Sequence, residues 1–368
     1  MQKRVYLSPP DLSGNEFRYI QEAMESNWVA PFGPQLDSFI SLLKKTTGSP
    51  YAEAVNSGTS AIHVALLALD ISENDVVFCP GFTFAASIFP ILYQKATPVF
   101  IDSEKQTWNM DPLLLEQAIQ DSIYKGQKPR AIILVHIYGF PAQIDKVIAM
   151  AHKYKLHVIE DAAESLGSTY NGKHTGTFGS IGTLSFNGNK IVTGSAGGAV
   201  LTADEYVFKR MRHFANQAKE DKPYYEHKDV GYNYRMSNIN AAIALAQTEQ
   251  LKQKIEKKKQ IRDWYEKYLK GFGAVKYSDI GDDNAWLTCV QFQEAIDPER
   301  IRLLLEEHNI ESRRLWNPMH NQPVFKDLVH YSNGISDSIF GSGLCLPSGT
   351  QLIEEDIVHI TDIVKHSL

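Results

Sequence analysis

A single lysine stands in a stretch of small and polar residues that could bring its amine close to a ligand. Lys190 lies within the segment GTLSFNGNKIVTGSAGGAV (182–200). Small residues let a backbone approach a ligand closely, and a lysine held in a pocket can form a Schiff base with an aldehyde. A lone loop lysine is more commonly a solvated charge, so the chemistry of Lys190 depends on which groups accompany it.

Two further segments carry groups that suit an anionic, ring-containing ligand. The run NSGTSAI (56–62) joins an expected strand to an expected helix. Its backbone amides and the Thr59 hydroxyl could bind a phosphate, although a simple turn with an N-cap explains the same residues. Asp161 ends the apolar run of HVIEDAAES and is either a helix N-cap or a functional carboxylate. A buried carboxylate needs a cationic or N–H partner, which the protonated ring nitrogen of a cofactor would supply.

Aromatic and basic residues add two weaker signals. The run PGFTFAAS places Phe84 just after an expected strand, where it either packs in the core or stacks on a planar ligand. The run ESRRLWNPMHNQPVF combines Arg313, Trp316 and His320. Each of these residues is common on protein surfaces, but together they would form a clamp for an anionic or nucleotide ligand.

The pattern of the N-terminal two thirds of the chain indicates how these residues are positioned. Short apolar runs at 52–58, 75–80, 97–102, 131–138 and 156–161 alternate with helix-like runs at 59–69, 82–94, 111–120 and 143–154. This alternation predicts an α/β fold with a mainly parallel sheet wrapped by helices. Ligands of such sheets bind beyond the carboxyl ends of the strands, so Thr59, Phe84 and Asp161 are expected at one rim.

The pattern changes after about residue 203. A long helical segment is expected at 237–270, and its Lys- and Glu-rich stretch QLKQKIEKKKQIRDWYEKYLK is interpreted as a solvated helix face. A smaller α/β unit follows, with a strand at 285–292 and a helix at 298–308. We therefore divide the chain into a large domain, residues 1–250, and a small domain, residues 251–368.

Composition limits the classes of protein that this chain can represent. Its 368 residues carry a formal net charge of −6 and no long basic block, which argues against a nucleic-acid or anionic-membrane partner. No run of about 18 apolar residues and no apolar leader is present, so a cytoplasmic location is expected. Cys79, Cys289 and Cys345 lie far apart and form no CxxC, so neither a disulfide framework nor a metal site is expected.

In their order along the chain, these motifs resemble a known family. A phosphate-binding turn, a stacking aromatic, a strand-end Asp and a loop Lys are the parts of a pyridoxal phosphate site. The chain resembles the sugar aminotransferases of the DegT/DnrJ/EryC/StrS type from SNWVAPFGP through NSGTSA, PGFTF, IEDAAES, LSFNGNK and GYNYRM to LCLPSGT. The resemblance implies the fold of aspartate aminotransferase, with a large, mainly parallel seven-stranded sheet and a smaller C-terminal α/β domain.

The resemblance also implies the central catalytic roles. Lys190 would bind the cofactor covalently and move a proton as general base and acid. Asp161 would keep the pyridine nitrogen protonated, and Phe84 would lie over the cofactor ring. Retention of Lys190 argues against the dehydrating branch of the family, which carries His there. Two departures, Ala196 where many members have Glu and Ser180 where Asp is usual, lie outside this chemistry, so activity is expected to survive.

Further residues are implied in holding the cofactor. Gly58, Thr59 and Ser185 would bind its phosphate through amides and hydroxyls. Asn233 is expected to reach the phosphate of the neighbouring subunit's cofactor, which implies a homodimer with shared active sites. Glu164 stands where many members have Gln or His beside the cofactor's 3-hydroxyl.

The implied substrates are L-glutamate, as amino donor, and a nucleotide-linked keto-sugar, used in a ping-pong exchange. The SFNGNK run and the run that contains Arg313 resemble the branch that aminates carbon 4 of UDP-2-acetamido-2,6-dideoxy-4-keto-hexose, a step toward bacillosamine-type sugars of bacterial surface glycans. The candidate substrate-binding residues are Asn27, Trp28, Arg313, Trp316 and His320. Three alternatives stay open: a dTDP- or GDP-linked 4-keto or 3-keto sugar, a non-catalytic nucleotide-sugar binder, and a Rossmann-type oxidoreductase, although GxGxxG is lacking.

Overall fold

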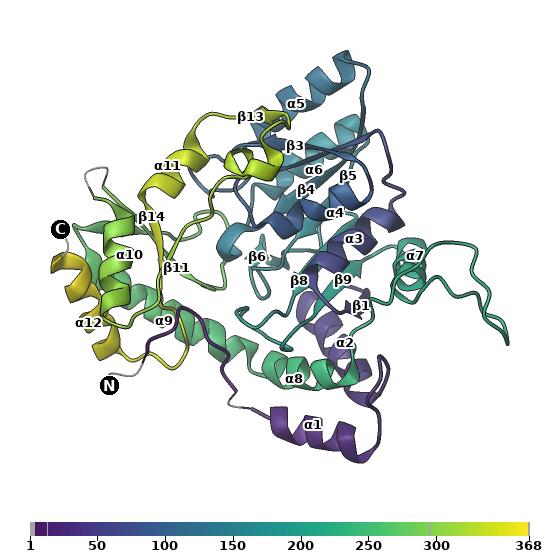
Figure 1. Cartoon of the computed structure of the whole chain (residues 1–368), viewed down its shortest axis with the longest axis horizontal. Helices are drawn as coiled ribbons and strands as arrows, with labels where there is room; N and C mark the ends of the chain where they lie inside the picture. Colours follow the sequence, from purple (N-terminus) through teal and green to yellow (C-terminus); the bar gives the residue numbers. More distant parts are fainter. Residues whose placement is uncertain (1–3, 13, 294–295, 367–368) are drawn as a thin grey trace.

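A large sheet covered by helices forms the centre of the structure, and a smaller sheet with its own helices lies beside it (Figure 1). The computed structural model describes residues 4–12, 14–293 and 296–366. Among these residues, no helix has both the length and the apolar character needed to cross a membrane.

The large sheet contains eight strands in the order β1-β9-β8-β5-β4-β2-β3-β13. The strands are β1 (Tyr51–Val55), β2 (Asp75–Pro80), β3 (Thr97–Ile101), β4 (Lys128–Val135), β5 (His157–Asp161), β8 (Ile181–Ser185), β9 (Gly198–Thr202) and β13 (His330–Tyr331). Strand β9 is antiparallel to both of its neighbours, β1 and β8, and the other adjacent pairs are parallel. The expected α/β fold is therefore confirmed. The short β13, which reaches edge strand β3 from the C-terminal part of the chain, adds an eighth strand to the expected seven.

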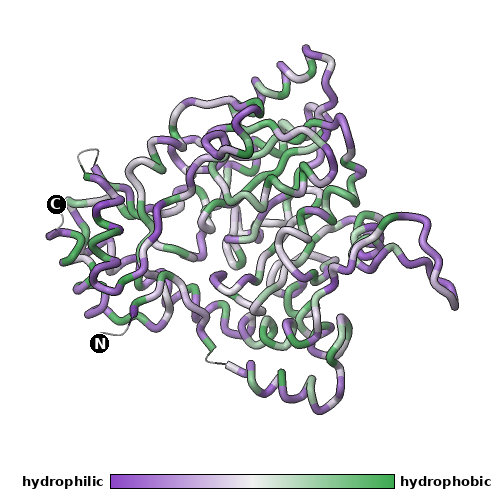
Figure 2. Tube along the Cα trace, viewed as in Figure 1, coloured by the Kyte–Doolittle hydropathy of each residue, from purple (hydrophilic) through white to green (hydrophobic). Residues whose placement is uncertain are grey.

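Side chains of the central strands enter two cores, one on each face of the sheet. In β2, Val77 and Cys79 lie in one core and Val76 and Phe78 in the other, as the two-residue period of a strand requires. The first core also takes side chains of α2 (Pro34–Thr47), α3 (Gly58–Ala68) and α7 (Glu205–Ala215), and the second those of α5 (Pro112–Tyr124) and α6 (Ile144–Tyr154). Hydrophobic residues accordingly follow the central strands, and hydrophilic ones the outer segments (Figure 2).

Residues 82–94 do not form the single helix that the sequence predicts. They form a 3-10 turn, η1 (Ala85–Ser87), and a short helix, α4 (Phe89–Tyr93), while Phe84 is extended with φ −78° and ψ 143°. Pro90 lies in the first turn of α4. A helix running through this position would make the proline ring clash with the carbonyl four residues earlier, so the helix starts anew.

Residues 237–270 form two helices rather than one. Helix α8 (Asn238–Glu249) packs against α1 (Glu16–Glu25) and α2. Helix α9 (Leu251–Leu269) instead contributes Ile261, Tyr265 and Leu269 to the core of the smaller unit. Gln250, with φ −103° and ψ 7°, separates the two helices, because their apolar faces pack against different cores.

The expectation of a fully solvated charged face on this segment is wrong. Three of its cations are buried: Lys254, Lys258 and Arg262. Lys258 Nζ donates to the carbonyl oxygens of Trp286 at 3.0 Å and Ser348 at 2.7 Å. Burial, with Lys254 nearby, lowers the pKa of Lys258 to about 7. Lys258 on α9 therefore links the segments that contain Trp286 and Ser348.

The smaller unit is built on an antiparallel four-stranded sheet in the order β10-β11-β14-β12. Its strands are β10 (Gly273–Val275), β11 (Thr288–Phe292), β12 (Arg313–Arg314) and β14 (Gly343–Leu346), and the helices α10 (Pro298–Glu307), α11 (Ile335–Ser342) and α12 (Glu354–His366) lie in the same part of the chain. The remaining elements are β6 (Thr169–Tyr170), β7 (Lys173–His174), η2 (Ile137–Gly139), η3 (Met319–Asn321) and η4 (Pro323–Phe325). The N-terminal segment also lies here, since Val5 pairs with Ile310 and the Leu7 carbonyl accepts from Ser348 N. The division of the chain at residue 250 stays a prediction.

Candidate active site

A cavity of about 450 Å³ lies where strands β1, β2, β5 and β8 end. The residues predicted from the sequence that line it are Gly58, Thr59, Phe84, Asp161, Glu164, Ser185, Lys190, Arg313 and Trp316. Strands β1, β5 and β8 run in one direction, because β9 between β1 and β8 is antiparallel to both. The turns that follow these strands therefore meet at one rim, as parallel sheets require.

The two acids that end β5 point to opposite sides. Glu160 is fully buried and accepts hydrogen bonds from His136 Nε2 at 3.0 Å and from the backbone amides of Gly176, Phe178 and Gly179. Burial acts to raise the pKa of Glu160, but these hydrogen bonds outweigh it and lower the pKa below its usual value. Glu160 therefore holds residues 176–179, which precede β8, close to β5.

Asp161 faces the cavity and is held in one orientation. Its Oδ2 accepts from Ser87 Oγ at 2.7 Å, and its Oδ1 accepts from Ala163 N at 3.1 Å. Ser87 Oγ also lies 2.9 Å from Thr83 Oγ1. The carboxylate is almost completely buried, and among the described residues no cationic side chain forms an ion pair with it. A buried carboxylate of this kind is suited to a cation supplied by a ligand.

Lys190 reaches the same cavity from the loop after β8. Its amine lies 3.4 Å from Glu164 Oε1 and 4.1 Å above the ring centre of Trp286. Glu164 Oε2 accepts from Tyr138 N at 2.6 Å. Burial raises the pKa of Glu164 above its usual value, although the charge of Lys190 acts in the opposite direction.

The start of α3 forms an anion cradle, a group of N–H and O–H donors, in the same cavity. Ser57 caps the helix by accepting from Ser60 N, which leaves the N–H groups of Gly58 and Thr59 in the first turn, where they have no intrahelical partner. A Cβ on Gly58 would lie 3.0 Å from Ser185 Cβ, so glycine permits the close approach of this hydroxyl. Two helix amides and the hydroxyls of Thr59 and Ser185 together suit a phosphate.

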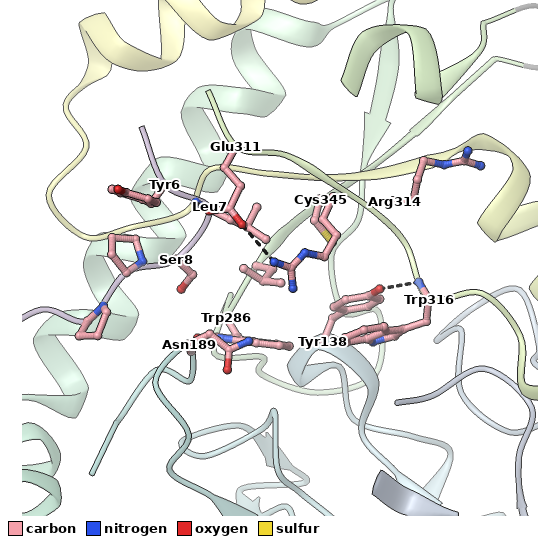
Figure 3. Close-up of a pocket in the computed structure, with 14 residues that line it drawn as sticks. Tyr6, Leu7, Ser8, Tyr138, Asn189, Trp286, Glu311, Arg314, Trp316 and Cys345 are labelled. Atoms are coloured by element: carbon pink, nitrogen blue, oxygen red, sulfur yellow. Dashed lines mark hydrogen bonds and ion pairs between the residues drawn. The ribbon is translucent and has the colours of Figure 1, made fainter. Parts of the chain in front are cut away.

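A second cavity of about 340 Å³ adjoins the first and shares Asn189, Trp286, Arg313 and Trp316 with it. Figure 3 shows Tyr6, Leu7 and Ser8 of the N-terminal segment on one side of it and the rings of Trp286, Tyr138 and Trp316 on another. The Tyr138 ring is stacked against both tryptophans, with ring centres 6.3 Å and 6.0 Å apart. Arg313 donates to Glu311 Oε1 at 3.0 Å. The second cavity thus combines aromatic faces with an arginine at its junction with the first.

The structure does not bring every predicted residue to these cavities. Asn27, Trp28 and Asn233 are exposed and line neither cavity. His320 also lines neither; its ring is stacked on His330 and its Nε2 lies 3.2 Å from Asp337. The roles of these four residues therefore stay predictions.

Comparisons with known proteins decide the family. The family model of the DegT/DnrJ/EryC1/StrS aminotransferase family matches residues 10–365. The chain belongs to this family. EpsN of Bacillus subtilis (strain 168), named as a candidate pyridoxal phosphate-dependent aminotransferase, is 44% identical to it, with 100% of this chain and 96% of EpsN covered. The GDP-perosamine synthase of Escherichia coli O157:H7 is 37% identical, with 99% of this chain and 98% of the relative covered.

A solved structure of the same family supports the fold. The DegT DnrJ EryC1 StrS aminotransferase of Brucella abortus has a TM-score of 0.91 and is 26% identical, with 96% of this chain and 95% of that chain covered. The protein is thus a pyridoxal phosphate-dependent sugar aminotransferase. Its first cavity fits this cofactor, because an amine, an oriented buried carboxylate and an anion cradle face one space.

The sequence did not point to several residues that shape this candidate site. Ser87 orients Asp161, Tyr138 supports Glu164 and Trp286 covers the Lys190 amine. Ser87 could have been proposed from the sequence, because it is a hydroxyl residue in PGFTFAAS, a run that is expected at the rim. Trp286 gave no such signal, because it lies in a different part of the chain and reaches the site only through the packing of the smaller unit.

Proposed function

We propose that the enzyme transfers the amino group of L-glutamate to carbon 4 of a nucleotide-linked 4-keto-6-deoxy sugar. The observation that carries this proposal is the placement of Lys190, Asp161 and the start of α3 around one cavity, beside a second cavity lined by aromatic rings and Arg313. Pyridoxal phosphate, when bound, supplies an aldehyde that accepts amines and a ring that stabilises negative charge on the substrate carbon.

The side chains of the first cavity then have separate tasks. Lys190 Nζ removes a proton from the substrate carbon and returns it, as general base and acid. Asp161, fixed by Ser87, keeps the ring nitrogen protonated. Phe84 covers one face of the cofactor ring. Its own ring is about half exposed and lies 5.3 Å from the ring of Trp316. The residues that would hold the phosphate are Gly58, Thr59 and Ser185, and Glu164 would contact the cofactor's 3-hydroxyl.

The active form is proposed to be a homodimer in which Asn233 serves the site of the other subunit. Asn233 is exposed and lies outside the cavities of its own subunit. The preceding segment extends away from the body (Figure 1) and carries exposed Tyr224, Tyr225 and Val230. Exposed apolar residues on a projecting segment are suited to contact with a second subunit.

Mixing variant subunits tests the shared site. Lys190→Ala subunits lack the amine, and Asn233→Ala subunits are expected to bind the cofactor phosphate weakly. If Asn233 acts across the interface, a hybrid dimer contains one complete site, and equal mixing restores about a quarter of the sites of a two-fold symmetric dimer. The assay uses a cofactor concentration that leaves Asn233→Ala largely empty. Activity equal to the mean of the separate variants, after proven subunit exchange, would show that Asn233 acts within its own subunit.

For the sugar nucleotide, we propose UDP-2-acetamido-2,6-dideoxy-4-keto-hexose, on the basis of the sequence resemblance of the SFNGNK and ESRRLWNPMHNQPVF runs. A GDP-linked keto-sugar is the second candidate, because several relatives that are 32–37% identical are named GDP-perosamine synthase. Incubation of the enzyme with glutamate and each keto-sugar in turn, followed by NMR of the product, separates the two. Amination of neither sugar would reject both candidates and leave the dTDP-linked keto-sugar to be assayed in the same way.

Arg313 is expected to bind the phosphates of the nucleotide sugar, because it stands where the two cavities meet. Loss of charge-assisted hydrogen bonds in Arg313→Ala should raise the KM for the nucleotide sugar by about 10- to 100-fold. The half-reaction with glutamate alone should stay near the wild-type rate. Arg300→Ala, which removes an exposed cation from α10 that lines neither cavity, is the matched control. An unchanged KM in Arg313→Ala would remove this residue from the site.

A further inference from the structure

The Lys190 amine rests against a tryptophan that belongs to a distant part of the chain. Its nitrogen lies 4.1 Å above the centre of the Trp286 ring and 3.4 Å from Glu164 Oε1. An ammonium over the face of an indole is attracted by the negative potential of the ring, and tryptophan is the strongest of the aromatic side chains in this respect. The ring and the carboxylate therefore hold the charged amine from two sides.

The ring is fixed with respect to the lysine loop. Trp286 Nε1 donates to the carbonyl of Asn189, the residue before Lys190, at 2.8 Å. Its backbone N–H donates to Asn284 Oδ1 at 3.0 Å, and its carbonyl accepts from the buried Lys258 Nζ at 3.0 Å. Two backbone hydrogen bonds thus hold the Trp286 main chain, and the indole itself is tied to the backbone of the lysine loop.

The same short segment also holds the backbone of Glu164, the residue that carries the carboxylate. Asn284, which is fully buried, donates from Nδ2 to the backbone carbonyl of Glu164 at 2.9 Å. The Glu164 side chain in turn accepts from Tyr138 N, and the Tyr138 ring is stacked on Trp286. Asn284 and Trp286 therefore hold Glu164 and Lys190 at a set separation.

We propose that Trp286 is a positioning residue that docks the Lys190 amine in its charged form whenever that amine is not joined to the cofactor. This inference rests on the proposed role of Lys190 in the reaction. The amine must leave the cofactor during each turnover and return to it. Contact with Trp286 on the cavity wall keeps the Lys190 amine close to the cofactor. The contact also stabilises the charge that the amine carries after it has taken up a proton.

The dock is tested in the cofactor-free protein, in which the amine is free throughout. Only a neutral amine reacts with acetic anhydride, so docking of the ammonium slows acetylation of Lys190. Trace labelling followed by peptide mass spectrometry gives the rate at Lys190 relative to Lys209, an exposed lysine on α7. Site-specific replacement of Trp286 by tryptophans carrying one, two and four fluorines weakens the negative face of the ring stepwise and leaves its shape and its N–H in place.

The expected result is a stepwise rise in the relative labelling rate of Lys190, reaching about 2- to 30-fold at the highest fluorination. Lys257, which lies over the separate Trp264 ring, should not change. Trp286→Phe keeps an aromatic face and should resemble the lightly fluorinated protein, whereas Trp286→Leu should label fastest. Equal labelling rates of Lys190 across the fluorinated series would show that Trp286 does not hold the charged amine. This series stays informative even if Trp286→Leu does not fold.

A separate measurement keeps this inference distinct from the proposed function. Borohydride reduction of the wild-type enzyme with pyridoxal phosphate should attach the cofactor to Lys190. If the label appears on another residue, the proposed role of Lys190 is wrong. The fluorination series would still report whether Trp286 holds the charged amine.

Discussion

Replacing Lys190 with alanine is expected to abolish amino transfer. The variant loses both the covalent attachment point of the cofactor and the base that moves the proton, and loss of general acid–base catalysis alone slows a reaction by about 10²- to 10⁴-fold. The glutamate half-reaction, followed in a single turnover by the absorbance of the bound cofactor, gives the rate directly. Borohydride should no longer attach the cofactor to the peptide that contains position 190.

Two controls separate the chemistry of Lys190 from its contribution to folding. Lys209→Ala removes an exposed lysine from α7 and should retain wild-type rates. Added ethylamine should partly restore the half-reaction of Lys190→Ala, because a small free amine can enter the space that the side chain leaves. Wild-type turnover by Lys190→Ala without added amine would contradict the assigned role.

Asp161→Asn is expected to produce the second large loss. The substitution keeps the size of the side chain but removes the buried negative charge that faces the cofactor ring. Breaking a buried charge pair costs about 3–5 kcal/mol. If the transition state loses all of this stabilisation, the rate falls by roughly 10²- to 10⁴-fold. The rate constant of the glutamate half-reaction at saturating cofactor measures this effect.

Graded variants test whether the charge of Asp161 or only its hydrogen bonds matter. Ser87→Ala removes the hydroxyl that donates to Asp161 Oδ2 and should cost about 0.5–1.5 kcal/mol, a loss of about 2- to 13-fold. Asp161→Glu restores the charge on a longer side chain and should lie between the wild type and Asp161→Asn. A half-reaction in Asp161→Asn as fast as in the wild type would show that the ring nitrogen needs no carboxylate.

Much of the fold could be predicted because its signals are local. The apolar runs that became β2, β3, β4 and β5 are buried on both faces of the sheet, so they read as continuous hydrophobic stretches in the sequence. The predictions from the sequence were wrong where the same run of residues is compatible with two different structures. Residues 82–94 look helical by composition although Pro90 divides them, and the lysines of α9 look solvated although Lys258 finds backbone carbonyls inside the protein.

The sequence by itself determined which groups of the first cavity face one another. Asp161 and Ser185 end β5 and β8, Thr59 and Lys190 follow β1 and β8, and the shared direction of these strands brings their ends to one rim. Only the tertiary structure decided what surrounds the Lys190 amine. Trp286 reaches the amine through the packing of the smaller unit, and contacts between residues so far apart in the chain depend on three-dimensional packing that no local pattern of residues encodes.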